Sequence, residues 1–202
     1  PPFFFLMIRR PPRSKIFTYT TLFRSALEIL TLAPKDQYRH MRKLWIAKDS
    51  RLPLKIEVLD FTGSTLEATI FTDLQVKKEL VNVDLSSNAK AVHHIHQFED
   101  IGITKVPFLI EKTPAGFEQI SYTRTSFPDG KQAVDQLLLS DGLSSVSVYL
   151  DKKSKNLRPS LQTAGAVNSF SRVIDDSLIT VIGDVPAVTV EAIAQSIVLK
   201  AK

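Results

Sequence analysis

The segment VDQLLLSDGLSSVSVYL, residues 134–150, decides the fold because it contains two candidate strands and the turn between them. Residues 134–139 and 143–150 are the strands, and Ser140-Asp141-Gly142 separates them. An Asp-Gly pair tolerates the positive φ angles that tight hairpin turns require. The segment therefore predicts a β-hairpin, and the rest of the chain is interpreted outward from it.

The residues that follow predict a second hairpin and a helix. Residues 164–174 and 178–183 are candidate strands about Asp175-Asp176, and Pro186 opens the last segment. Apolar residues then recur at the three-and-four spacing of a buried helical stripe, at Val190, Ile193, Ala194 and Ile197. An antiparallel sheet packed on one terminal helix is an α+β design.

The residues before the hairpin predict two more strands and a connection. Residues 106–111 and 117–126 are candidate strands, and Pro114-Ala115-Gly116-Phe117 is the turn between them. The loop signal Phe127-Pro128-Asp129-Gly130-Lys131 leads into the hairpin. A polar stretch, residues 73–92, holds at most a short helix around residues 89–93. We expect residues 75–105 to link two domains.

A separate meander of three strands is expected nearer the N-terminus. Residues 38–46, 54–61 and 66–72 are the strands, with turns at residues 48–51 and 62–64. Residues 54–61 alternate with a period of two, which indicates one buried face. Three strands alone cannot cover such a face. We therefore expect part of this domain to be missing from the chain.

Residues 1–25 carry all of the excess charge. The chain has 26 Lys and Arg against 21 Asp and Glu, for a net charge of +5. Residues 1–25 contain no acidic residue, and their basic residues are Arg9, Arg10, Arg13, Lys15 and Arg24. From Ala26 onward, 21 basic residues balance 21 acidic ones. The charge therefore gives no support for a nucleic-acid or membrane-surface partner.

The amino-acid sequence of residues 1–25 also resembles a translated sequencing adapter and not part of a natural protein. Residues 19–25, YTTLFRS, are the translation of TAC ACG ACG CTC TTC CGA TCT, a common end of sequencing-library adapters. In a signal peptide the charges precede the apolar run, whereas here the apolar residues 3–8 come first. The proline pairs at 1–2 and 11–12 would break the helix of a mitochondrial-type presequence. We expect residues 1–25 to be an artefactual leader.

Several motifs resemble, in order and spacing, those of the sigma-E factor regulatory protein RseB/MucB family. The first is a Trp–turn–Leu-Pro hairpin, at Trp45, 51–54, 59–60, Gly63 and 66–67. A Pro-x-Gly-Phe turn at 114–117 and a Tyr-Ser-Asp-Gly hairpin at 139–143 follow, with Leu139 in place of the aromatic residue. Residues 179–186 and 193–197 are similar to the closing strand and helix of that family.

The resemblance implies a two-domain periplasmic protein represented here by its C-terminal half. Residues 26–74 would be the last strands of a truncated domain resembling lipoprotein carriers, a half-barrel around an apolar cavity. Residues 106–202 would be the RseB/MucB-type C-terminal domain, a small antiparallel sheet with a terminal helix. The signal peptide and most of the first domain would be absent.

The resemblance also implies a function in the envelope stress response. Family members bind the periplasmic domain of a membrane anti-sigma factor, RseA or MucA, and shield it from proteolysis. Lipopolysaccharide or lipoprotein, bound through the first domain, is thought to release them. The interface residues are not indicated by the sequence. The alternative, from another functional class, is a periplasmic carrier of lipid or lipoprotein built on the same kind of sheet.

Side chains that could carry chemistry have simpler interpretations, and we predict no catalytic, cofactor or metal site. His93, His94 and His96, followed by Glu99 and Asp100, form the one metal-like cluster, but a solvated linker patch explains them. Asp129-Gly130 and Asp175-Asp176 are explained as turns. Ser140-Asp141-Gly142 is not the Gly-x-Ser-x-Gly pattern of a nucleophile elbow. Trp45 is more typical of a core than of a ligand contact. With no cysteine in the chain, a thiol nucleophile or a Cys-ligated zinc cannot occur.

Overall fold

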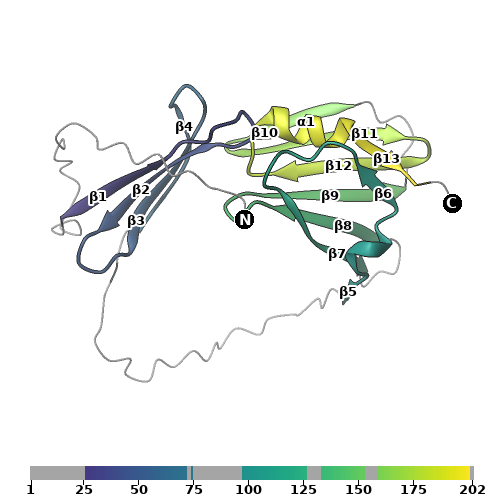
Figure 1. Ribbon diagram of the computed structural model, residues 1–202, viewed down its shortest axis with the longest axis horizontal. Helices are drawn as coiled ribbons and strands as arrows, with labels where there is room; N and C mark the ends of the chain where they lie inside the picture. Colours follow the sequence, from purple (N-terminus) through teal and green to yellow (C-terminus); the bar gives the residue numbers. More distant parts are fainter. Residues whose placement is uncertain (1–25, 72–73, 75–96, 127–132, 153–158, 201–202) are drawn as a thin grey trace, which may run out of the picture.

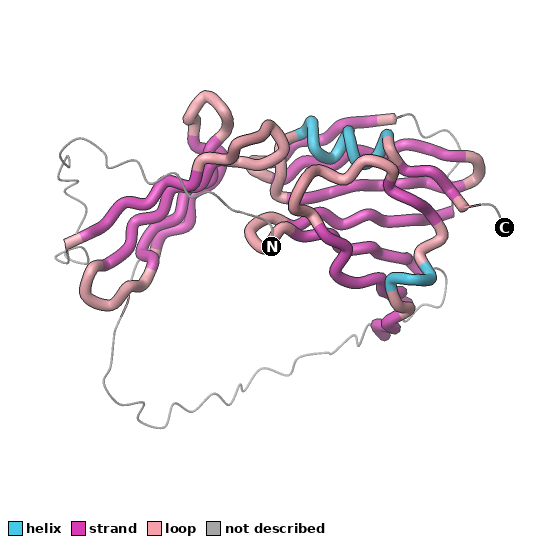
Figure 2. Tube along the Cα trace, in the orientation of Figure 1, coloured by secondary structure: helices cyan, strands magenta, loops and turns pink. Residues whose placement is uncertain are grey.

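The structure, a computed structural model, describes residues 26–71, 74, 97–126, 133–152 and 159–200. These residues form three antiparallel sheets and one α-helix (Figures 1 and 2). The predicted α+β class is therefore confirmed. We call residues 26–71 the first unit and residues 97–200 the second unit. Within the described ranges, no helix is long and apolar enough to cross a membrane.

The first unit is a four-stranded meander in the order β1-β2-β3-β4. Its strands are β1 (Leu27–Leu32), β2 (Met41–Ala47), β3 (Pro53–Leu59) and β4 (Thr65–Ile70). The last three were predicted, but β1 was not. The first predicted strand begins at Met41 and not at residue 38, because Tyr38 donates its N–H to Oδ1 of Asp36 in a turn.

The second unit is built on a seven-stranded sheet in the order β10-β11-β12-β9-β8-β7-β5. Its strands are β5 (Gln97–Asp100), β7 (Glu118–Ser126), β8 (Ala133–Ser140), β9 (Ser145–Lys152), β10 (Ser160–Ala164), β11 (Val167–Ile174) and β12 (Ser177–Gly183). The predicted hairpin about Asp141-Gly142 is β8–β9, and the one about Asp175-Asp176 is β11–β12.

The helix α1 (Ala187–Gln195) packs on β11 and β12 (Figure 1). A two-stranded ribbon of β6 (Phe108–Ile110) and β13 (Ile197–Leu199) lies beside it, and a 3₁₀ helix (Ile103–Lys105) precedes β6. The predicted helical stripe was wrong at Ile197. The helix ends at Gln195, and Ile197 pairs with Ile110 as a strand residue, still buried.

The main core lies between the seven-stranded sheet and its helix and ribbon. One row of facing side chains crosses the sheet from Phe170 through Val181, Val148 and Leu137 to Tyr122. Val190 and Ile193 of α1 are fully buried against this core. All residues of the core cluster lie between 106 and 197, so no strand of the first unit contributes to it within the described residues.

Two further differences from the expectations concern strand boundaries. Strand β5 lies inside the segment expected to be a linker, and it pairs with β7. The strand expected at 164–174 begins at Val167, because Gly165, with φ of 59°, turns the chain back to the unpredicted β10. Residues 1–25, most of the expected linker and the expected helix at 89–93 lie outside the described residues.

Candidate functional site

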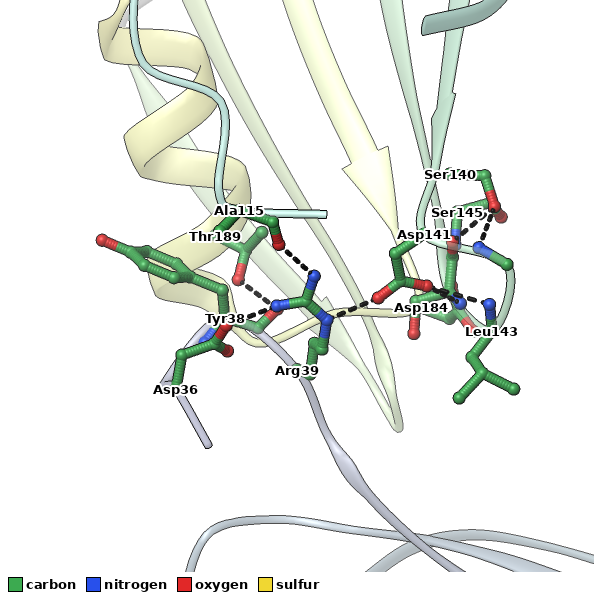
Figure 3. A network of polar contacts seen from close by, with 12 residues as sticks. Asp36, Tyr38, Arg39, Ala115, Ser140, Asp141, Leu143, Ser145, Asp184 and Thr189 are labelled. Atoms are coloured by element: carbon green, nitrogen blue, oxygen red, sulfur yellow. Dashed lines mark hydrogen bonds and ion pairs between the residues drawn. The ribbon is translucent and has the colours of Figure 1, made fainter. Parts of the chain in front are cut away.

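The first unit meets the second through a set of polar contacts that we call the seam (Figure 3). The first unit contributes the end of the loop after β1 and the start of β2. The second unit contributes the turns before β7 and after β8, the β10–β11 turn, the connection after β12 and the start of α1. The seam residues are Asp36, Tyr38, Arg39, His40 and Arg42 on one side and Ala115, Phe117, Asp141, Ser144, Ala166, Asp184 and Thr189 on the other.

Arg39 is the central cation of the seam. Its Nε donates to Oδ2 of Asp141 at 2.5 Å, and its other nitrogens bind the Asp36 carboxylate and the Ala115 carbonyl (Figure 3). The guanidinium also lies 4.9 Å from the centre of the Phe117 ring. A planar guanidinium can donate several hydrogen bonds from its edge while its face contacts an aromatic ring. Arg39 therefore connects one segment of the first unit with two turns of the second.

Asp141 is the buried acceptor for Arg39. Its side chain is fully buried, and its Oδ1 accepts the backbone N–H groups of Leu143 and Ser144 at 2.9 and 2.7 Å. The turn that sequence patterns assigned to Asp141 is thus real, and Gly142 adopts the required φ of 89°. The same carboxylate has a second role that turn chemistry does not reveal. It holds the first unit against the second.

Arg42 and Asp184 form a second pair across the seam. Arg42 Nη2 donates to Oδ2 of Asp184 at 2.7 Å and to the Ser144 hydroxyl at 3.1 Å. Asp184 uses its other oxygen, Oδ1, to accept the Ser145 N–H at 2.8 Å. The Ser145 N–H therefore holds the Asp184 carboxylate in place within the second unit, which fixes the direction from which Arg42 binds it.

Two neutral contacts complete the seam. His40 Nε2 lies 3.0 Å from the Ala166 carbonyl, and Thr189 on α1 donates its hydroxyl to the Tyr38 carbonyl at 2.9 Å. Burial lowers the pKa of His40 below its ordinary value of 6.5. The neutral imidazole, donating through Nε2, is thus the form that fits the seam.

The contacts of the seam position the two units relative to each other. The Asp141 and Asp184 carboxylates of the seam accept hydrogen bonds from arginines and backbone N–H groups, and the Thr189 hydroxyl donates to a backbone carbonyl. Over the described residues, no group of three or more His, Cys, Asp or Glu side chains could hold a metal ion. The seam is a joint whose geometry is set by charged and neutral hydrogen bonds.

The sequence candidates for chemistry do not converge on the seam, except for Asp141. His93, His94, His96 and Asp129-Gly130 lie outside the described residues. Asp100 accepts the Gly102 N–H in a turn, and Asp175 occupies the hairpin turn with φ of 51°. Asp176 is exposed in that same turn. Glu99 stands opposite Arg124 in the β5–β7 pair.

Trp45 is buried as predicted, with 8% of its surface exposed. The ammonium groups of Lys43 and Lys55 lie 4.9 and 4.4 Å from the centre of its ring, within the range of cation–π contacts. Lys55 also binds Glu57 at 2.6 Å. The indole thus packs within its own sheet.

The other perturbed groups belong to a network inside the second unit. Asp135 accepts two hydrogen bonds from Arg124, at 2.6 and 2.8 Å, and one from the Tyr122 hydroxyl at 2.9 Å. Hydrogen bonding to Arg124 lowers the pKa of Asp135, while burial raises that of Tyr122. A tyrosine held in its neutral form and a paired carboxylate stabilise the sheet and are not poised for acid–base chemistry.

Two family models match the chain, one to each unit. The MucB/RseB N-terminal domain matches residues 24–89, and the MucB/RseB C-terminal domain matches residues 103–198. The chain belongs to the MucB/RseB family. The resemblance expected from the motifs is confirmed, and the two turns that carried it, at 114–117 and 139–143, meet at Arg39.

Named relatives of this MucB/RseB chain include sigma-factor regulators. The sigma-E factor regulatory protein RseB of Salmonella typhimurium is 28% identical over 180 residues, which are 86% of this chain and 55% of that protein. The sigma factor AlgU regulatory protein MucB of Pseudomonas aeruginosa is 29% identical over 175 residues, 84% of this chain and 55% of that protein. The chain thus spans about half the length of the curated relatives it matches.

Solved structures of MucB have the same fold. The crystal structure of MucB in complex with MucA(peri) matches 93% of this chain and 67% of that chain, with a TM-score of 0.73 and 25% identity. A crystal structure described as that of MucB matches 90% of this chain and 60% of that chain, with a TM-score of 0.61 and 26% identity. Both units are therefore included in each match.

Proposed function

We propose that this chain is part of a periplasmic negative regulator of the sigma-E envelope stress response. It binds the periplasmic part of a membrane anti-sigma factor and shields that part from proteolysis. It acts by binding and not by catalysis. The observation that carries the proposal is the match of 93% of the chain, across both units, to MucB in complex with MucA(peri).

Family membership and the named relatives support the same function. The reported relatives are regulators of sigma-E and of AlgU, which favours a regulator over a lipid carrier. The seam supports it as well, because a joint of ion pairs holds two sheets in one arrangement without forming a reactive centre.

The experiment is a calorimetric titration of the chain with the periplasmic domain of the anti-sigma factor from the same genome. We expect saturable binding with a dissociation constant of about 1 µM or tighter. A matched titration uses an unrelated periplasmic domain of similar size and charge, which should give no binding heat. A folded chain that shows no binding at about 100 µM partner would overturn the proposal.

A further inference from the structure

Strand β4 leaves one edge of the first sheet open. It is the last strand in the order β1-β2-β3-β4, and five of its six residues are exposed. The strand at the opposite edge, β1, is mostly half-buried. Among the described residues, β4 pairs with β3 alone, so the backbone groups on its other side are unpaired. Such an edge is a template for pairing with another chain.

The register of β4 shows which backbone groups point outward. The Phe71 N–H donates to the Leu54 carbonyl at 3.0 Å, just beyond the end of the strand. Hydrogen-bonded and non-bonded pairs alternate along an antiparallel ladder. Thr69 therefore bonds to β3, whereas Ala68 and Ile70 direct their N–H and carbonyl groups away from it. These outward groups have the spacing that an added strand requires.

An exposed aromatic side chain lies at the start of this edge. Phe61, in the turn before β4, has 95% of its surface exposed. The turn is fixed, because Oδ1 of Asp60 accepts the N–H groups of Thr62 and Ser64 at 2.9 and 2.8 Å. Phe61 is therefore available to a partner without any reordering of its backbone, which favours binding.

The far end of the edge is apolar as well. Ile70 and Phe71 are 49% and 48% exposed. Glu67 is the one charged side chain of β4, and the strand has neither the lysine nor the proline that often protects an edge. The edge is therefore complementary to an extended chain that carries apolar side chains and no net negative charge.

We propose that an extended segment of the anti-sigma factor's periplasmic part adds to β4 as a new edge strand. Its backbone pairs with Ala68 and Ile70, and its apolar side chains contact Phe61 and Phe71. This inference rests on the proposed function. Proteases bind their substrates as extended chains, so a segment paired along β4 cannot occupy a protease active site at the same time. A second copy of this chain fits less well, because a stable interface buries at least about 1,200 Å², more than one six-residue edge supplies.

Amide hydrogen exchange, followed residue by residue by NMR in the full chain, tests the pairing. In the free chain, Ala68 and Ile70 should exchange rapidly, and Thr69 slowly. Saturation with the periplasmic domain of the cognate anti-sigma factor should slow Ala68 and Ile70 by about ten-fold or more. Unchanged rates in the bound state would overturn strand addition, as would slow exchange in the free chain. Slow exchange that dilution of the free chain abolishes would identify a second copy as the occupant instead.

A proline at the same edge tests the effect on affinity. Ala68→Pro removes an N–H that points away from β3, which an edge strand tolerates, and it should weaken partner binding about ten-fold. Leu161→Pro on the edge strand β10 is the matched control. Ala164 and Val167 close the two-residue β10–β11 loop, so the Leu161 N–H also points away from the neighbouring strand. This control should bind the partner like the wild type.

Phe61→Ser tests the same surface without touching the backbone, so it decides the matter if Ala68→Pro lowers the stability of the chain. It should weaken partner binding roughly five-fold or more and leave the thermal unfolding midpoint unchanged, because the ring is exposed. Wild-type affinity in both Ala68→Pro and Phe61→Ser would overturn strand addition alone. A wild-type chain that binds no partner would overturn the proposed function itself.

Discussion

Arg39 and Asp141 form a pair at 2.5 Å, with 14% of the arginine side chain and none of the aspartate side chain exposed. The two residues are 102 positions apart in the sequence. A carboxylate so deeply buried needs a permanent positive partner, because removing either member of a buried pair leaves an uncompensated charge. This pair is therefore the contact in the seam with the largest expected effect on stability.

Arg39→Met should lower the free energy of unfolding by about 3 kcal/mol, because Asp141 then stays buried without its cation. Chemical denaturation followed by tryptophan fluorescence measures this change. Arg51→Met is the matched control. Arg51 lies 3.6 Å from Glu28 with both side chains more than half exposed, so its loss should cost less than about 0.5 kcal/mol. Equal effects of the two substitutions would contradict the account of Asp141.

Gly183→Ala should destabilise the second unit by about 2 kcal/mol or more, because the strands β12 and β9 would be forced apart. A Cβ at Gly183 would lie 2.4 Å from the Ser145 carbonyl oxygen and 3.0 Å from Cγ2 of Val146. Gly142→Ala is the control, since a Cβ there meets open space and only the positive φ is strained, at about 1 kcal/mol. Thermal unfolding distinguishes the two, and a Gly183→Ala chain as stable as Gly142→Ala would refute the close approach.

Acidification should weaken the seam through His40. Burial lowers its pKa below 6.5, so the closed seam favours the neutral ring. Arg42 lowers this pKa further, while Asp184 and the Ala166 and Val185 carbonyls raise it, without cancelling the effect of burial. The stabilisation is therefore complete above pH 6.5 and is lost as the pH falls through the window just below it.

His40→Gln keeps an N–H donor but does not titrate, so it isolates this effect. Between about pH 8 and about pH 5, the free energy of unfolding of the wild type should fall relative to that of the variant. Parallel pH profiles for the two proteins, measured by urea denaturation, would show that His40 carries no pH dependence.

The second unit should fold without the first, because its core and its seven-stranded sheet are built from its own residues. Residues 97–202 produced alone are expected to unfold in one cooperative transition by calorimetry. Residues 26–71 alone should not fold, because four strands of one meander lack a cover for their apolar side chains. A broad, featureless transition for residues 97–202 would argue against an independent domain.

Local patterns predicted local structure well. The hairpins about Asp141 and Asp175 and most of the helix could be recognised because turn chemistry and apolar spacing act over a few residues. Strands β10 and β13 were missed because each is short and adjoins an element with a stronger pattern. The artefactual nature of residues 1–25 stays a proposal, which sequencing of the genomic locus tests.

The seam could not have been predicted from the single sequence. Arg42 and Asp184 are 142 positions apart, and nothing in either neighbourhood marks one as the partner of the other. Asp141 had a sufficient explanation as a turn residue, which hid its contact with Arg39. The available signal was the ordered set of turn motifs shared with the family. Two of them converge on Arg39 in space, although they are distant along the chain.

Protection of the anti-sigma factor from proteolysis tests the central claim most directly. The periplasmic domain of the cognate anti-sigma factor is incubated with the protease that makes the first cut in the envelope stress cascade, with and without saturating chain. We expect cleavage to slow by at least about ten-fold in the presence of the chain, because at a free chain concentration of about ten times the dissociation constant only about a tenth of the domain stays unbound. An unchanged cleavage rate, with binding of the chain verified in the same sample, would contradict the account.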